Sequence, residues 1–174
     1  MRAVFLDRDK TLNEDPGYLS DPTAMRLLPG VLEGLSSLQA RGLRLVLISN
    51  QAGVGRGYFS EATMWAVHAR LEQLLAAGGV HLDAAYYCQH APWDGCACRK
   101  PQPGMLLQAA RELNIDLAAS FMVGDKLADV EAGRHAKCAT ILIRATPLDS
   151  PSTFADVVCA DLVAAAAWIA ARVS

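Results

Sequence analysis

The sequence predicts a three-layer α/β fold in which helices cover both faces of a parallel sheet. Three observations predict it. Short apolar runs alternate along the chain with longer segments that have helical periodicity. The runs are apolar throughout rather than at every second residue, which is typical of strands buried on both faces. Polar, cysteine-rich or glycine-rich residues follow the runs, and parallel sheets bind ligands at the carboxyl ends of their strands.

The strands are assigned from these continuous apolar runs. The first run, residues 3–6, ends abruptly at the charged segment that begins with Asp7. A second run follows Gly42, and three later runs each precede a polar or cysteine-containing segment. We expect strands at residues 3–6, 43–48, 84–87, 121–123 and 140–143, with a short one at 157–158.

The helices are assigned from apolar residues three and four positions apart. Gly42 ends the first of these segments, and Ser60 is a favourable N-cap for the second, which Gly78 closes. We expect helices at residues 30–41, 61–77, 103–113, 128–136 and 162–172. Residues 7–23 and 51–57 are expected to be loops, because they contain prolines and glycines respectively.

Length and composition limit the class of protein. The chain has 174 residues, of which 52% are hydrophobic, so we expect residues 1–174 to form one domain with a sizeable core. The net charge of -2 leaves no general basic surface, so we expect no nucleic-acid partner. No apolar run reaches the roughly 18 residues of a membrane span, and the N-terminus lacks the long apolar core of a signal peptide. We therefore expect a cytoplasmic protein without membrane association.

Two aspartates directly after the first strand are candidates for chemistry. Asp7 and Asp9 lie two residues apart. Such a pair can share a hard cation such as Mg²⁺, or one carboxylate can attack as a nucleophile while the other protonates a leaving group. Charged pairs are also common in ordinary solvated loops, so this pair alone does not decide between the alternatives.

Two further clusters follow the second and third strands. Ser49, Asn50 and Gln51 offer a hydroxyl and two amides, which could donate hydrogen bonds to phosphate oxygens or stabilise a local turn. Arg99 and Lys100 place two cations side by side, which suits recognition of an anion but is also typical of an exposed basic pair.

The last cluster follows the fourth strand and completes a recognisable order. Asp125 would extend from that strand as a third carboxylate, and Asp129, one helical turn later, could hold a ligand or Lys126. Acidic residues at a helix N-terminus also have a purely structural explanation. In order, the chain has Asp-x-Asp-x-Thr, a strand-end Ser, a Lys and Gly-Asp-x-x-x-Asp. This order, which spans nearly the whole chain, resembles the haloacid dehalogenase-like phosphatase superfamily.

The resemblance implies a Rossmann-like fold without a cap domain and a phosphatase that forms an aspartyl-phosphate. It implies that Asp7 is the nucleophile and Asp9 the general acid/base. Ser49 would orient the phosphoryl group and Lys100 would neutralise it. Asp7, Asp125 and the backbone carbonyl of Asp9 would hold Mg²⁺. The chain departs from the family at one position of the first motif, because Lys10 stands where glycine is usual.

A cysteine-rich segment predicts a second metal. Four soft ligands lie within eleven residues: Cys88, His90, Cys96 and Cys98. In a reducing compartment this density favours a metal over disulfides. Three thiolates and one imidazole complete a tetrahedral shell without an open position, so we expect a structural Zn²⁺. Because Cys98 immediately precedes Arg99, we expect the zinc to aim Arg99 and Lys100 into the site.

The same segment resembles two branches of the superfamily, the heptose 1,7-bisphosphate phosphatases and the histidinol-phosphate phosphatases. Residues 50–57 and 122–127 favour the heptose branch, whereas the short spacer before Cys96 is similar to the histidinol-phosphate branch. The heptose branch implies removal of the 7-phosphate during synthesis of ADP-heptose, a lipopolysaccharide core precursor. A catalytically inactive, zinc-stabilised binding protein is the alternative from another class, although loss of function would not be expected to spare all the motif residues.

The heptose branch also implies the residues that contact substrate. We expect the partner to be a small phosphorylated sugar and the protein to be a monomer. Arg99 is the natural contact for a second phosphate, and Arg56 is a weaker candidate. The expected substrate-binding residues are Asp15, Pro16, Gly17, Tyr18, Ser49, Asn50, Gln51, Ala52, Arg56, Arg99, Lys100 and Lys126.

Overall fold

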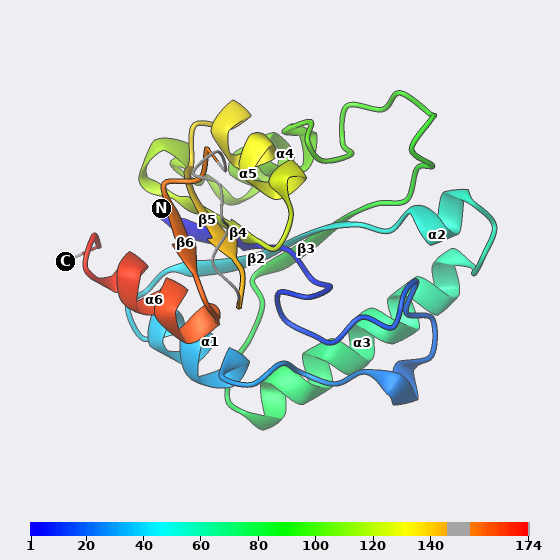
Figure 1. Ribbon diagram of the computed structural model, residues 1–174, viewed down its shortest axis with the longest axis horizontal. Helices are drawn as coiled ribbons and strands as arrows, with labels where there is room; N and C mark the ends of the chain where they lie inside the picture. The colour runs from blue at the N-terminus through cyan, green and yellow to red at the C-terminus, as the bar shows by residue number, and fades with distance from the viewer. Residues whose placement is uncertain (146–153, 174) are drawn as a thin grey trace.

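A six-stranded parallel sheet forms the centre of the molecule, as the sequence predicts (Figure 1). The computed structural model describes residues 1–145 and 154–173. Its strands are β1 (Ala3–Leu6), β2 (Arg44–Asn50), β3 (Ala84–Cys88), β4 (Phe121–Gly124), β5 (Ala139–Ile143) and β6 (Val157–Cys159). Its helices are α1 (Val31–Gln39), α2 (Ala52–Gly55), α3 (Glu61–Ala77), α4 (Gly104–Leu113), α5 (Leu127–His135) and α6 (Leu162–Ala170), with 3₁₀ turns η1 (Pro22–Ala24) and η2 (Leu117–Ala119).

The order of the strands reverses direction beside β1. The order is β3-β2-β1-β4-β5-β6, and each neighbouring pair is parallel. The chain moves outward from β1 to β2 and β3 and then returns to β4, on the other side of β1. Sheets of this kind bind ligands where the order reverses, here at the carboxyl ends of β1 and β4. Asp7 lies at this point, and its backbone amide donates to the Val123 carbonyl at 2.9 Å.

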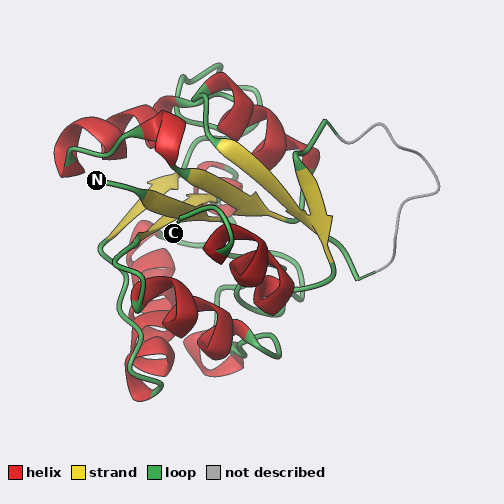
Figure 2. Ribbon diagram, turned by 90° about the vertical axis from the view of Figure 1, so that its left-hand side faces the viewer, coloured by secondary structure: helices red, strands yellow, loops and turns green. Residues whose placement is uncertain are grey.

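Helices cover both faces of the sheet, which confirms the expected three layers (Figure 2). Helices α1, α3 and α6 pack on the face that receives Val4 and Leu6 of β1. Helices α4 and α5 cover the opposite face, which receives Ala3 and Phe5. Alternate residues of one strand therefore enter two different cores, which is why the strand sequence is apolar throughout.

One predicted loop contains a helix. Residues 51–57 include the single helical turn α2, which is too short to show apolar periodicity. Gly55 lets this turn approach the cysteine-rich loop, because a Cβ at that position would clash with the backbone nitrogen of Ala91. The loop expected over residues 7–23 likewise contains most of η1.

The other differences concern the ends of helices and strands; β2, for example, is Arg44–Asn50 rather than 43–48. Helix α1 ends at Gln39, before the expected residue 41, and α6 ends at Ala170 rather than 172. Helix α5 begins at Leu127, one residue early, because the Asp129 carboxylate accepts a hydrogen bond from the Lys126 amide at 3.0 Å and caps the first turn. Within the described residues, no helix is both long and apolar enough to cross a membrane.

Candidate active site

The polar side chains expected at the strand ends meet at the carboxyl edge of the sheet. Asp7 follows β1, Ser49 lies near the end of β2, and Asp125 follows β4. Lys100 comes from the long loop after β3. Asp7, Ser49 and Lys100 are buried, and Asp125 is half-buried. The parallel strands thus bring together residues that are far apart in the sequence.

Lys100 lies at the centre of this site. Its ammonium nitrogen is 2.7 Å from Asp7 Oδ1 and 2.6 Å from Asp129 Oδ1, and it donates to the Ile48 carbonyl oxygen at 2.8 Å. Burial opposes the charge, but the carboxylates of Asp129 and Asp7 outweigh it and raise the pKa of Lys100. Lys100 therefore remains a cation beside the candidate nucleophile.

The backbone of Lys100 is fixed as well. The Asn50 side chain donates to the Lys100 carbonyl oxygen and accepts from the Lys100 amide, both at 3.0 Å. We expected Asn50 to contact substrate, but its amide group is used here to hold Lys100. The position of the cation is therefore set from both ends of the residue.

Asp129 has a larger part in the site than the sequence pattern indicates. Its Oδ1 pairs with the Lys100 ammonium, and its Oδ2 caps α5 through the Lys126 amide. The spacing of the fourth cluster pointed to Lys126 or a ligand as the partner of Asp129. The partnership with Lys100 has no signal in that spacing, because Lys100 lies in a different loop.

The carboxylates of this site could hold a divalent cation. One oxygen from each of Asp7, Asp125 and Asp129 lies within 4.8 Å of the others. Among residues 1–145 and 154–173, Asp125 Oδ1 is buried without a hydrogen-bond partner. Burial raises the pKa of Asp7 to about 7, against the opposing effect of Lys100, and also raises the pKa of Asp125. A cation would satisfy the unpartnered oxygen and favour both ionised forms, and hard oxygen donors suit Mg²⁺.

The side chain of Asp9 is held apart from this group. Its Oδ1 accepts from Arg8 Nε and Asn13 Nδ2, and its Oδ2 accepts from Arg8 Nη2 and Gln51 Nε2, over 2.9 to 3.1 Å. Burial opposes ionisation of Asp9, but the Arg8 guanidinium and the hydrogen bonds outweigh it and lower the pKa. Gln51 also donates to Ser49 Oγ at 2.9 Å, so it links Asp9, after β1, with Ser49, near the end of β2. Metal binding through the Asp9 backbone remains a prediction.

The backbone at Lys10 has a conformation that glycine adopts more easily than any other residue. Its φ of +62° lies in the left-handed region, which disfavours residues with a side chain. The turn is closed by the Lys10 amide, which donates to the Asn13 carbonyl at 2.8 Å, and by the Leu12 amide, which donates to the Arg8 carbonyl at 2.8 Å. The Lys10 side chain is exposed. Lys10 therefore adds backbone strain and leaves the site residues in place.

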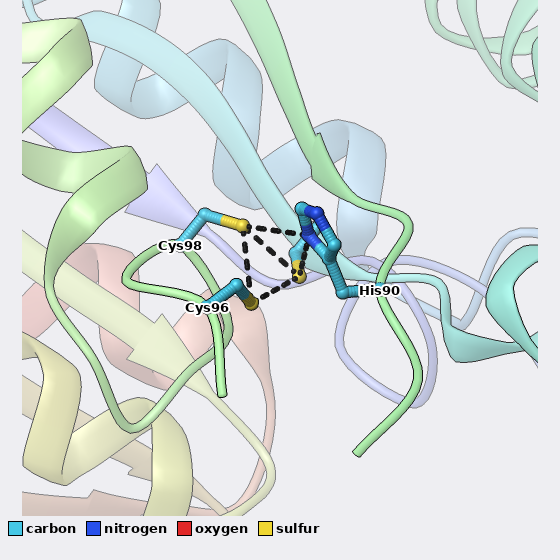
Figure 3. Close-up of side chains that lie close together, drawn as sticks. His90, Cys96 and Cys98 are labelled. Atoms are coloured by element: carbon cyan, nitrogen blue, oxygen red, sulfur yellow. Dashed lines mark hydrogen bonds between the residues drawn. The ribbon is translucent and has the colours of Figure 1, made fainter. Parts of the chain in front are cut away.

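The second metal cluster lies at the end of β3 and in the loop that follows it, where its side chains turn toward one another (Figure 3). Cys88 Sγ is 3.6 Å from Cys96 Sγ and 3.2 Å from Cys98 Sγ, and His90 Nδ1 is 3.2 Å from Cys98 Sγ. Ligands on a tetrahedral zinc, with sulfur about 2.3 Å from the metal, would lie about 3.8 Å apart. The four ligands fit Zn²⁺ as the sequence predicts and use every corner of its shell.

Two arginines lie beside the cysteine cluster. The Arg56 guanidinium is 4.9 Å from the centroid of the Trp93 ring. Arg99 is half-buried and lines a hollow of 490 Å³ together with Lys100 and the cysteine loop. In the described part of the chain, Arg99 Nη1 and Arg56 Nε are buried without a hydrogen-bond partner. Unpaired guanidinium nitrogens at a site edge suit an anionic ligand.

The loop after β1 reaches α2 at the same end of the sheet (Figure 1). The Asp15 carboxylate accepts from the Gly17 amide at 2.9 Å, and Pro16 and Gly17 are exposed. The ring of Tyr18 meets that of Tyr58 edge-on, with centroids 4.9 Å apart. The two remaining residues that we expect to contact substrate lie where helices begin. Ala52 is buried at the start of α2, and Lys126 is exposed just before α5.

Comparison with known proteins agrees with this geometry. The HAD-hydrolase-like (haloacid dehalogenase-like) family model matches residues 97–165. D-glycero-beta-D-manno-heptose-1,7-bisphosphate 7-phosphatase of Pasteurella multocida (strain Pm70) is 47% identical over 150 residues, which cover 82% of each chain. The enzyme with the same name from Helicobacter pylori (strain J99 / ATCC 700824) is 41% identical over 170 residues, 97% of each chain.

A solved structure extends the agreement to the fold. D,D-heptose 1,7-bisphosphate phosphatase from B. bronchiseptica, complexed with magnesium and phosphate, superposes with a TM-score of 0.87. It is 37% identical, and the match covers 99% of each chain. The site geometry, the relatives and the shared fold lead to one assignment: the chain belongs to the D-glycero-D-manno-heptose 1,7-bisphosphate 7-phosphatase family of haloacid dehalogenase-like hydrolases.

Proposed function

We propose that this protein removes the 7-phosphate from D-glycero-D-manno-heptose 1,7-bisphosphate, in the synthesis of ADP-heptose for the lipopolysaccharide core. The observation that carries the proposal is the buried pair of Lys100 and Asp7, 2.7 Å apart at the reversal of strand order. A cation fixed against a carboxylate is what attack on a phosphate dianion requires, because nucleophile and substrate repel one another.

Asp7 is the nucleophile in this proposal. Its carboxylate attacks phosphorus, the bond to the sugar oxygen breaks, and an aspartyl-phosphate forms. Lys100, held by Asp129 and Ile48, offsets the negative charge of the phosphoryl group. The Ser49 hydroxyl orients the same group. Mg²⁺ held by Asp7 and Asp125 supplies further positive charge when it is bound.

Asp9 moves the protons. The negative charge of a bound phosphate raises the pKa of a neighbouring carboxyl group, so Asp9 takes up a proton in the substrate complex and gives it to the departing sugar oxygen. As a carboxylate it then takes a proton from the water that releases phosphate from Asp7. Four hydrogen bonds hold its carboxyl group in one orientation. Proton transfer needs this precision, because donor and acceptor must lie within hydrogen-bond distance in the transition state.

The substrate preference rests on a second anion site. Arg99 is adjacent in sequence to Lys100, and its Nη1 is among the buried nitrogens without a partner in the described residues. A bisphosphate offers one phosphate to the Asp7 site and another to Arg99, with Arg56 as a second cation at the rim. A monophosphate lacks the group that would fill this second position.

The proposal includes a monomeric enzyme in the cytoplasm. Free cysteines support the compartment, because thiolate ligands persist where the environment is reducing. Sedimentation of the purified protein tests the monomer.

Phosphate release from heptose 1,7-bisphosphate and from histidinol phosphate, measured side by side, tests the proposal. We expect kcat/KM to be at least about 100-fold higher for the bisphosphate, since a buried polar group left unpaired by the wrong substrate costs that much or more. Phosphorus NMR of the product should show that the 1-phosphate remains.

An arginine variant provides the matched control. Arg99→Gln should lower kcat/KM for the bisphosphate and leave histidinol phosphate nearly unchanged, whereas Arg41→Gln, the same change on a distant exposed residue, should affect neither. Faster release from histidinol phosphate, or loss of the 1-phosphate first, would contradict the proposed substrate.

A further inference from the structure

Arg8, between the two aspartates of the first motif, has a buried guanidinium that no soluble substrate can reach. Its side chain is 0% exposed. Arg8 Nε lies 3.0 Å from Asp9 Oδ1 and Arg8 Nη2 lies 3.1 Å from Asp9 Oδ2, so the two groups form a bidentate pair. A buried charge is costly unless it is paired, and this one is paired with the residue that moves protons in the proposed function.

Arg8 differs from the other groups that hold Asp9. Asn13 donates to Oδ1 alone, and Gln51 donates to Oδ2 alone. A single donor leaves a carboxyl group able to rotate about its χ2 angle, whereas a planar guanidinium that engages both oxygens fixes the plane of the group. Among the described donors to Asp9, Arg8 is thus the one residue that engages both oxygens.

A row of side chains supports Arg8 from behind, of which His68 is buried, Tyr87 is half-buried and Trp65 and Glu72 are exposed. The guanidinium carbon lies over the Tyr87 ring, 6.0 Å from its centroid. Tyr87 Oη is 2.9 Å from His68 Nδ1, and His68 Nε2 is 3.3 Å from Glu72 Oε1 on α3. The Trp65 ring meets both His68 and Tyr87 edge-on. This row connects the β1 motif to α3 through the end of β3.

We propose that Arg8 is a positioning residue, which orients the Asp9 carboxyl group for proton transfer to the leaving sugar oxygen, and that Tyr87 and His68 hold Arg8 in place. The inference rests on the proposed function of Asp9. It predicts an effect on one chemical step: a misoriented Asp9 delays protonation of the leaving group, while substrate and metal binding are unchanged. Protonation matters most when the leaving group is a poor one.

The test compares Arg8→Lys and Arg8→Met with wild type on aryl phosphates of graded leaving-group acidity and on the sugar bisphosphate. Arg8→Lys retains the charge but cannot engage both oxygens, and Arg8→Met retains the volume. For both we expect kcat to fall at most about 3-fold with p-nitrophenyl phosphate and about 100-fold with the sugar substrate, the scale of general acid catalysis. KM and the magnesium dependence should stay within about 2-fold of wild type. Arg44→Lys, the same change in an exposed ion pair with Asp83, is the matched control and should change neither rate.

Two further measurements keep the proposal testable if a variant at Arg8 fails to fold. Tyr87→Phe removes the hydroxyl that contacts His68. It should show the same dependence on the leaving group, with kcat for the sugar substrate lowered about 3-fold. In an Asp9→Asn background, Arg8→Lys should have no additional effect on the sugar substrate, because the two residues act as a unit. A loss of equal size for every leaving group, a rise in KM with unchanged kcat, or wild-type rates would overturn the proposal. If wild type hydrolyses aryl phosphates but not the sugar bisphosphate, the proposed substrate fails, and the graded aryl series still tests Arg8.

Discussion

The aspartate–lysine site (Asp7, Lys100, Asp125 and Asp129) and the cysteine cluster (Cys88, His90, Cys96 and Cys98) are built in opposite ways. The first collects residues from the segments after three strands and from α5, and direct ion pairs hold it together. The second takes its four ligands from eleven consecutive residues, and burial raises the pKa of the Cys88 thiol. A thiol that holds its proton needs a metal to become a ligand.

The difference teaches which parts of the site depend on zinc. Lys100 is adjacent to Arg99 in the cysteine loop, yet it has partners outside that loop in Asp7, Asp129, Asn50 and Ile48. We therefore refine the expectation that zinc aims both cations: it should position Arg99 more than Lys100. We propose that the sheet positions the candidate nucleophile Asp7 and its cation Lys100, and that the cysteine loop forms the edge of the site with Arg99.

The largest effect should come from removing the proposed nucleophile. Asp7→Asn keeps the shape of the side chain and leaves Lys100 paired with Asp129. Turnover should fall below roughly 1% of wild type, because no other group can form the covalent intermediate. Zinc content and the circular dichroism spectrum should not change. Steady-state hydrolysis above a few per cent of wild type would show that Asp7 is not the nucleophile.

A smaller effect is expected from Asp129→Asn, which removes one of the two carboxylates that hold Lys100. Misplacing the ammonium by about 1 Å should lower kcat/KM by 10- to 100-fold for every phosphate ester. Asp156→Asn is the matched control, since Asp156 holds Thr140 on β5 rather than Lys100. That variant should lose stability with little change in rate. Equal kinetic losses in the two variants would mean that Asp129 acts only through stability.

Magnesium should stabilise the fold in a pH-dependent way. The pKa of Asp7 is raised from 3.8 to about 7, so between these values the folded state binds a proton that the unfolded state has lost. The contribution of Asp7 to the stability of metal-free protein therefore falls as the pH rises through this window. Mg²⁺ favours the ionised form, so it should raise Tm more at about pH 7.5 than at about pH 5. Thermal melts of wild type and Asp7→Asn check this, because the variant should lose the part of the pH dependence that Asp7 contributes and keep the part due to Asp125, whose pKa burial also raises.

The smallest effect should come from Lys10→Gly. The left-handed φ of Lys10 costs about 1–2 kcal/mol, and glycine recovers this less its own entropic cost of about 0.5–1 kcal/mol. The variant should be more stable by about 0.5–1 kcal/mol in urea denaturation and retain its turnover. A loss of stability would mean that the Lys10 side chain makes a favourable contribution that outweighs the strain.

The sequence predicted the sheet and the cysteine cluster because both leave local signals. Continuous apolar runs mark β1, β2, β4 and β5, and the spacing from Cys88 to Cys98 marks the cysteine cluster. Partnerships between distant side chains leave no such signal. Three features follow from how the loops after different strands meet: the ion pair of Asp129 with Lys100, the hydrogen bonds of Asn50 with the Lys100 backbone, and the burial of Arg8.

Activity of zinc-free protein on two substrates tests the central claim most directly. The claim is that the sheet positions Asp7 and Lys100, whereas the zinc-binding loop positions Arg99 at the edge of the site. Cys96→Ala protein, shown by elemental analysis to have lost the zinc that wild type contains, is compared with wild type on the sugar bisphosphate and on p-nitrophenyl phosphate. We predict a loss of about 100-fold on the bisphosphate, for which Arg99 is displaced, and at most about 3-fold on the aryl phosphate, which needs only the site held by the sheet. Equal losses on both substrates, full activity on the bisphosphate, or no zinc in wild type would contradict the account.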